Sequence, residues 1–142
     1  MHSDYIPIEV IDHTADTGII ARGATLNSLF RNAALGFTRL IVSVPPAKPD
    51  KTKKVMLEGC DPADLFVKWL GEILYFLQGE EMVTVEARIK SVSRNRLEAD
   101  LDVVGFDPAR HEMTLDVKAV TYHQSMVWND GTLWLGRVIL DL

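Results

Sequence analysis

Two stretches of the chain repeat apolar residues at the spacing of a helix. Residues 26–41 place their apolar side chains on one helical face, and Thr25 before them is a suitable N-cap. Further on, Asp61 is a suitable cap and Pro62 suits the first helical position, and a broad apolar stripe follows as far as Leu77. The pattern predicts two amphipathic helices that face a core.

The other apolar residues fall mostly in short runs that are typical of β-strands. The predicted strands are residues 6–11, 18–21, 53–57, 83–92, 97–104, 114–122, 126–128 and 133–140. Turn-forming residues at 93–96 and 129–131 predict hairpins. Because strands dominate and most are joined by hairpins, we predict an α+β fold with two amphipathic helices packed on largely antiparallel sheet(s).

Length and composition favour one domain. The chain has 142 residues, of which 47% are hydrophobic and 25% charged, and the proline-rich segment 44–50 is expected to be a loop inside the domain at 1–142. No apolar run approaches the roughly 20 residues needed to cross a bilayer, and the start lacks the features of a signal peptide. We therefore expect a cytoplasmic protein with no membrane partner.

The single cysteine and the net charge narrow the chemistry. Cys60 can form neither an internal disulfide nor a thiolate metal cluster, and we expect an inert thiol that is buried or lies at a strand end. The net charge of −5 argues against a dedicated nucleic-acid binder, because phosphate contacts need clustered Lys and Arg. Any RNA contact would have to be local or provided by a partner.

The densest polar cluster is the loop Asp12-His13-Thr14-Ala15-Asp16-Thr17-Gly18 between two predicted strands. Its aspartates offer hard oxygen ligands for calcium, magnesium or manganese, with His13 as an added ligand for a softer ion. The same residue types also make a tight turn with no ligand at all. The triplet Asp16-Thr17-Gly18 spells the aspartic protease signature, but that enzyme needs two such aspartates and the triplet occurs once.

Two further clusters carry polar groups. Asp141, beside Leu142 at the end of a hydrophobic strand, is either a cation ligand or part of a solvated tail. In the segment 106–112, Arg110 could bind a phosphate or a carboxylate and His111 could act as acid or base, although such a stretch is more often an exposed connection. His123 is more readily explained as a structural histidine than as a ligand.

Four segments of the chain together resemble the archease family. They are Asp12-His13-Thr14-Ala15-Asp16, the run from Asp64-Leu65 through Trp69-Leu70-Gly71-Glu72-Ile73-Leu74-Tyr75, Val117-Lys118-Ala119-Val120-Thr121-Tyr122-His123, and Leu140-Asp141-Leu142. They occur in the family's order and cover nearly the whole chain. The resemblance implies an archease-like α+β fold around a strand–helix–strand–strand module.

The resemblance also implies a site. The family's metal ligands map to Asp16, Asp141 and the backbone or terminal oxygen of Leu142, which would hold a divalent metal of the calcium type. Asp12 and His13 would be neighbours of this site. Arg110, His111 and Lys118 are candidate contacts to a partner. Arg110 stands where the family usually carries Lys, and the two side chains are not equivalent for bidentate contacts.

The function that the resemblance implies is assistance to another enzyme. Archease-like proteins promote guanylylation and multiple turnover of the GTP-dependent tRNA-splicing RNA ligase, so tRNA would be reached only through the ligase and the chain itself would not be an enzyme. One alternative is a chaperone-like binding module for RNA-modifying enzymes. Another is a small metal-dependent hydrolase, but the sequence holds no Walker loop, HExxH or G-x-S-x-G motif.

Overall fold

The computed structural model describes residues 6–12 and 17–142. Its elements, in chain order, are β1 (Ile8–Asp12), β2 (Thr17–Gly23), α1 (Leu26–Ile41), β3 (Lys51–Glu58), α2 (Pro62–Gly79), β4 (Met82–Val92), β5 (Arg96–Gly105), β6 (Ala119–Asn129) and β7 (Trp134–Asp141). In the part of the chain described here, no helix is long and apolar enough to cross a membrane.

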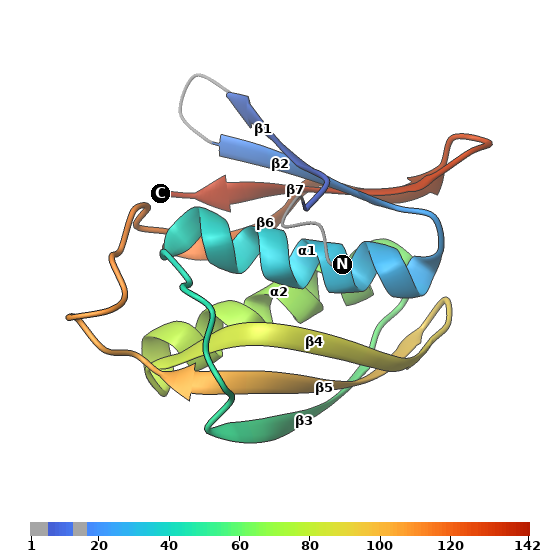
Figure 1. Cartoon of the computed structure of the whole chain (residues 1–142). Helices are drawn as coiled ribbons and strands as arrows, with labels where there is room; N and C mark the ends of the chain where they lie inside the picture. Colours follow the sequence, from blue (N-terminus) through green and yellow to red (C-terminus); the bar gives the residue numbers. More distant parts are fainter. Residues whose placement is uncertain (1–5, 13–16) are drawn as a thin grey trace.

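The strands form two antiparallel sheets with the two helices between them (Figure 1). One sheet has four strands in the order β1-β2-β7-β6, and the other has three in the order β3-β5-β4. The predicted α+β class, with two helices on antiparallel sheets, is confirmed. The predicted strand–helix–strand–strand module corresponds to β3, α2, β4 and β5.

Local signals fix where both helices begin. Thr25 and Ser28 form a reciprocal capping box at the start of α1, in which the Thr25 side chain accepts a hydrogen bond from the Ser28 N–H at 3.1 Å. At the start of α2, Asp61 accepts a hydrogen bond from the Asp64 N–H at 2.8 Å, and Pro62 needs no donor at its position. Both predicted helix starts are correct.

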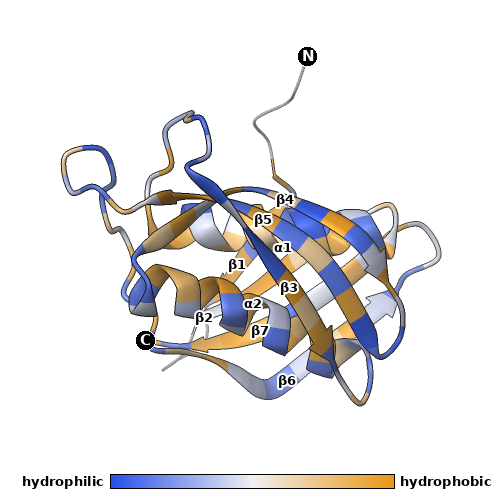
Figure 2. Ribbon diagram, turned by 90° about the horizontal axis from the view of Figure 1, so that it is seen from below, coloured by the Kyte–Doolittle hydropathy of each residue, from blue (hydrophilic) through white to orange (hydrophobic). Residues whose placement is uncertain are grey.

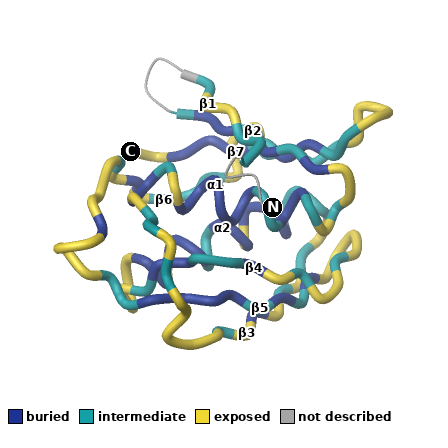
Figure 3. The backbone as a smooth tube through the Cα atoms, viewed as in Figure 1, coloured by how far each residue is buried: buried dark blue, intermediate teal, exposed yellow. Residues whose placement is uncertain are grey.

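The core lies where the helices meet both sheets (Figures 2 and 3). Phe30 of α1 and Phe66 of α2 pack edge to face with ring centroids 5.5 Å apart, and both are fully buried. Trp69 is also fully buried, and its indole N–H donates to the Phe30 carbonyl at 2.8 Å. The two helices are therefore joined by a hydrogen bond as well as by apolar contact.

The prediction was wrong for the segment before β6. Residues 114–118 form no strand, because the N–H groups of Thr114 and Leu115 donate to the carbonyl of Ile41 at the end of α1, at 2.8 and 3.3 Å. The strands predicted at 114–122 and 126–128 belong to one continuous strand, β6, which begins only at Ala119. A bulge lies between Thr121 and Met126 and interrupts the alternation of side chains.

Candidate functional site

The candidate site lies at one end of the four-stranded sheet, where β2, near the start of the chain, pairs with β7, the last strand. Asp12 at the end of β1 pairs with Thr17, and Thr17 pairs with Leu140 of β7. Ala119 pairs with Asp141 in the next strand, β6. The ends of four strands thus meet beside the C-terminus, on the left in Figure 1. Thr17 and Leu140, which are far apart in sequence, are direct neighbours here.

Part of the predicted metal site falls outside the described residues. Asp16 and His13 belong to the segment 13–16, and of Asp12 only the backbone, as the last residue of β1, is described. These three residues stay predictions. The structure does place the two residues that flank the segment. Thr17 pairs with Leu140 near the end of β7, and Asp12 pairs with Thr17 one strand further out.

Asp141 is held in place at its backbone and open at its side chain. It is the last residue of β7, pairs with Ala119, and accepts a hydrogen bond at its carbonyl from the Lys118 N–H at 2.7 Å. The interpretation as a solvated tail is therefore wrong for Asp141. Its exposed carboxylate forms no hydrogen bond or ion pair with any residue in the described ranges, and Leu142 beside it is 38% exposed.

The donor chemistry at this end partly fits a hard cation. An exposed carboxylate on an ordered strand and the neighbouring oxygen of Leu142 are ligands of the type that calcium prefers. Among residues 6–12 and 17–142, however, no three His, Cys, Asp or Glu side chains are arranged to hold a metal. A complete site would need ligands from the segment 13–16, as the resemblance implies.

The segment 106–112 is an exposed connection, as predicted, except that His111 within it is buried. His111 is only 5% exposed, its ring stacks on Phe106 at 5.6 Å, and its Nδ1 accepts a hydrogen bond from the Asp107 N–H at 2.9 Å. His111 is thus a structural part of the turn. Arg110 and Lys118 are exposed, the Lys118 N–H donates to the Asp141 carbonyl, and both residues stay candidates for contact with a partner.

A polar cluster that the sequence did not reveal lies at the start of α2. The Asp64 carboxylate accepts a hydrogen bond from the Cys60 N–H at 2.8 Å, which lowers the pKa of Asp64 below its ordinary value, and it also contacts Tyr122 and Lys68. Burial and the hydrogen bond to Asp64 raise the pKa of the Tyr122 hydroxyl. Cys60 itself is exposed just after β3, so the buried alternative predicted for its thiol is wrong. No local motif could have signalled this pairing of α2 with β6.

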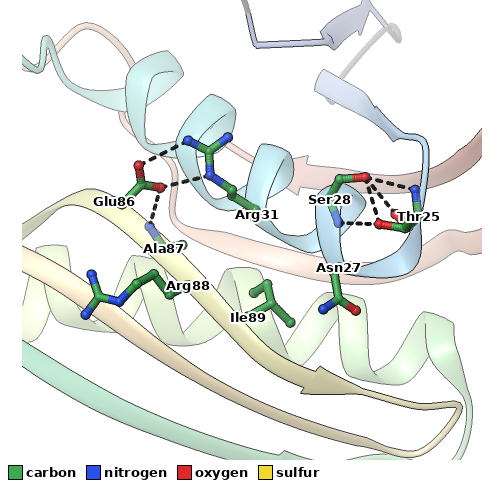
Figure 4. A pocket seen from close by; sticks show the side chains of 8 residues that line it. All are labelled: Thr25, Asn27, Ser28, Arg31, Glu86, Ala87, Arg88 and Ile89. Carbon is green, nitrogen blue, oxygen red and sulfur yellow. Dashed lines mark hydrogen bonds and ion pairs between the residues drawn. The ribbon is translucent and has the colours of Figure 1, made fainter. Parts of the chain in front are cut away.

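One groove beside charged residues is structural. A hollow of about 650 Å³ lies between α1 and β4 (Figure 4). Arg31 in this hollow forms two hydrogen bonds to Glu86, at 3.0 and 3.1 Å, and Arg88 binds Asp102 on β5 through both of its terminal nitrogens. Because both guanidinium groups are already paired with carboxylates, this groove offers no free cation to an anionic ligand.

Comparison with known proteins agrees with this geometry. The model of the Archease protein family (MTH1598/TM1083) matches residues 8–142. "Protein archease" of Sulfurisphaera tokodaii is 30% identical over 135 residues, which cover 94% of this chain and 97% of that protein. "Protein archease" of Methanosarcina acetivorans is 30% identical over 138 residues, covering 94% of each.

Solved structures show the same architecture. Protein 1598 of Methanobacterium thermoautotrophicum superposes with a TM-score of 0.75 and 27% identity, over 97% of this chain and all of that one. A Thermotoga maritima protein described as "an archease, possible chaperone" has a TM-score of 0.63 and 20% identity over the full length of both chains, a likeness that shows the fold alone.

The fold and the converging strand ends define a small α+β protein in which β2 and β7, from opposite ends of the chain, pair beside exposed polar groups. The chain belongs to the archease family.

Proposed function

We propose that this chain is an accessory activator of a GTP-dependent tRNA-splicing RNA ligase, promoting its guanylylation and its multiple turnover. The observation that carries the proposal is membership of the archease family across residues 8–142. On this proposal the chain is cytoplasmic, is not itself an enzyme, and meets tRNA only through the ligase. The net charge of −5 suits approach to a basic RNA-binding cleft, since opposite charges raise encounter rates.

The acidic end of the four-stranded sheet is the proposed centre of this activity. Asp16, Asp141 and an oxygen of Leu142 would hold a divalent metal, with calcium as the first candidate, and Asp12 and His13 would lie beside it. A bound cation would supply positive charge for oxygen ligands of the partner. The support within the described residues is the ordered strand that presents Asp141, whose carboxylate has no partner there. Arg110 and Lys118 would contact the ligase beside this end.

The test is ligation of an RNA with a cyclic-phosphate end by limiting ligase, with and without this protein, under multiple-turnover conditions. Wild type is expected to accelerate turnover at substoichiometric amounts, and Asp141→Asn or Asp16→Ala plus Asp141→Ala to lose most of that acceleration. Glu58→Gln is the matched control, because Glu58 is an exposed carboxylate at the end of a strand in the other sheet. Full stimulation by the double variant would refute the proposed site.

Metal binding can be measured independently of ligation. Titration of the protein with terbium, whose luminescence reports oxygen ligands, is expected to show a site that calcium displaces and that Asp141→Asn weakens at least tenfold. Equal binding by wild type and Asp141→Asn would remove Asp141 from the ligand set, whatever the ligation assay shows.

A chaperone-like module is the second candidate, favoured by the description of the Thermotoga maritima protein as a possible chaperone. Such a module would change the solubility or the specificity of an RNA-modifying enzyme in proportion to the amount added. An activator acts at substoichiometric amounts, so the dose dependence of the ligation assay separates the two.

A further inference from the structure

A groove between α2 and β6 borders the acidic end at Lys118 and Ala119. It has a volume of about 510 Å³, and its lining includes Gly71 and Leu74 from the helix and Ala119 and Val120 from the strand. Gln78 closes one end of the helix–strand contact, because its side chain donates to the Val117 carbonyl at 2.5 Å. The groove therefore follows a fixed helix–strand pair.

Gly71 has no role inside the molecule that explains it. A Cβ at Gly23 would come within 2.3 Å of the Leu29 nitrogen, and one at Gly136 within 2.6 Å of the Phe66 ring, so packing requires glycine at both. A Cβ at Gly71 would have no described neighbour within 4 Å. Glycine in a helix interior is unfavourable relative to alanine. Packing within the described residues therefore does not require glycine here, and its missing side chain leaves the groove open on the helix side.

The strand beside this helix has an unpaired edge. β6 is the last strand in the order β1-β2-β7-β6, and in the described part of the chain it pairs only with β7 (Figure 2, lower margin). Alternate N–H and C=O groups of an edge strand point away from its neighbour and can pair with an added strand. Between this edge and the helix, a segment of about four extended residues would cover residues 119–122.

The side chains at the groove favour a peptide with apolar and acidic residues. Tyr75 lines the groove and is 56% exposed, whereas the other large apolar side chains of α2 are buried. Lys118 on the opposite wall is exposed and forms no ion pair with any residue in the described ranges. An apolar side chain would fit over Gly71 against Tyr75, and a carboxylate would reach Lys118.

We propose that the groove between α2 and β6 binds an extended segment of a partner protein, which adds a strand to the free edge of β6 and sets an apolar side chain over Gly71. The groove borders the acidic end and shares Lys118 with it, but the proposal is carried by Gly71, Tyr75 and the free edge of β6, none of which has a role in the function proposed there.

The probe is a phage-displayed library of random peptides of about nine residues, selected on wild type and counter-selected on Gly71→Arg. The Arg side chain fills the groove, and because Gly71 faces open space this variant should fold, which circular dichroism checks. Selected peptides are expected to lose at least tenfold in affinity with Gly71→Arg and with Tyr75→Ala. Met56→Ala is the matched control, since Met56 is 60% exposed on the other sheet and should bind the peptides unchanged.

Two further measurements test the added strand and the role of the glycine. Methylation of successive peptide nitrogens should weaken binding at every second residue, because only alternate N–H groups of a strand face β6. Gly71→Ala should raise the melting temperature by a few degrees while it weakens peptide binding, since helix propensity improves as the groove narrows.

Three results would overturn the proposal. One is a selection that yields no peptide whose binding depends on Gly71. Another is a methylation profile without the period of two. The third is concentration-dependent dimerisation that Gly71→Arg abolishes, which would identify a second copy of this chain as the occupant.

Discussion

The two sheets are built from different parts of the chain. All three strands of the sheet β3-β5-β4 lie between residues 51 and 105, whereas the four-stranded sheet joins β1 and β2 from the first 23 residues with β6 and β7 from residues 119–141. The three-stranded sheet closes with the short β4–β5 hairpin, in which the Ser93 N–H donates to the Arg96 carbonyl at 2.9 Å. The four-stranded sheet can form only when the two ends of the chain have come together.

The two sheets also differ in how their polar side chains are paired. In the three-stranded sheet, Arg88 pairs with Asp102, and Lys90 lies 3.4 Å from Asp100. The four-stranded sheet presents the open carboxylate of Asp141 and the free edge of β6. Both proposed binding surfaces therefore belong to the sheet that the most distant parts of the chain assemble.

The largest expected effect comes from Gly23 in the four-stranded sheet, and Gly105 in the three-stranded sheet is its control. Gly23→Ala at the end of β2 should lower the free energy of unfolding by about 3 kcal/mol, because the new Cβ would meet the Leu29 backbone nitrogen at 2.3 Å and backbone cannot easily move aside. Gly105→Ala at the end of β5 should change it by less than about 0.5 kcal/mol, since the nearest atom there is 3.8 Å away. Urea denaturation measures both.

Equal effects at the two glycines would contradict the view that close packing between β2 and α1 fixes the four-stranded sheet. A loss for Gly23→Ala well below 1 kcal/mol would likewise mean that the start of α1 shifts to accommodate a methyl group.

A smaller effect is expected from the ion pair on the three-stranded sheet. Asp102→Asn should destabilise the protein by on the order of 1 kcal/mol, because it weakens hydrogen bonds to Arg88 and Thr52, and because Arg88 is half exposed the pair is partly screened. Asp100→Asn is the neighbouring control. One of its carboxylate oxygens is buried without a hydrogen bond, so its loss should be smaller.

The same pair predicts a pH dependence of stability. The hydrogen bond from Arg88 lowers the pKa of Asp102 below its ordinary value of 3.8. The stabilisation is therefore complete above about pH 4 and is lost as the pH falls through the lowered pKa. Wild type should lose stability below pH 4 more steeply than Asp102→Asn, as acid titration of unfolding in urea would show. Parallel profiles would mean that Asp102 does not couple to folding.

Most elements could be predicted from the sequence because their signals are local. The caps Thr25 and Asp61 and the apolar stripes after them define the helices without reference to the rest of the chain. The β4–β5 hairpin likewise follows from two alternating runs around a turn. The split prediction for β6 failed because the bulge after Thr121 breaks the alternation that identifies a strand.

The candidate site was less accessible to such reasoning. Local spacing alone predicted a turn around Asp16 and a tail at Asp141, and only the family resemblance assigned both residues to one metal site. The structure adds the pairing of Thr17 with Leu140, a contact that no local pattern encodes. The groove beside Gly71 and the contact of Asp64 with Tyr122 depend in the same way on how α2 packs beside β6.

The smallest expected effects concern two residues with left-handed backbone. Gln124 in the bulge of β6 has φ of 53°, and Glu81 between α2 and β4 has φ of 55°. Relief of left-handed strain by glycine, about 1–2 kcal/mol, should slightly exceed the added entropy of the unfolded chain, about 0.4–1 kcal/mol. Gln124→Gly and Glu81→Gly should each gain about 0.5 kcal/mol.

Alanine at the same two positions keeps the strain and should give no gain, which makes Gln124→Ala and Glu81→Ala the controls. Thermal unfolding of the four variants would then compare the two sheets directly. A gain at Glu81 without one at Gln124 would mean that contacts of the Gln124 side chain offset the strain of the bulge. It would also mean that the Gln124 side chain helps to maintain the bulge, in addition to the register of β6 against β7. The exposed Tyr122, which contacts Asp64 of α2, lies in this bulge.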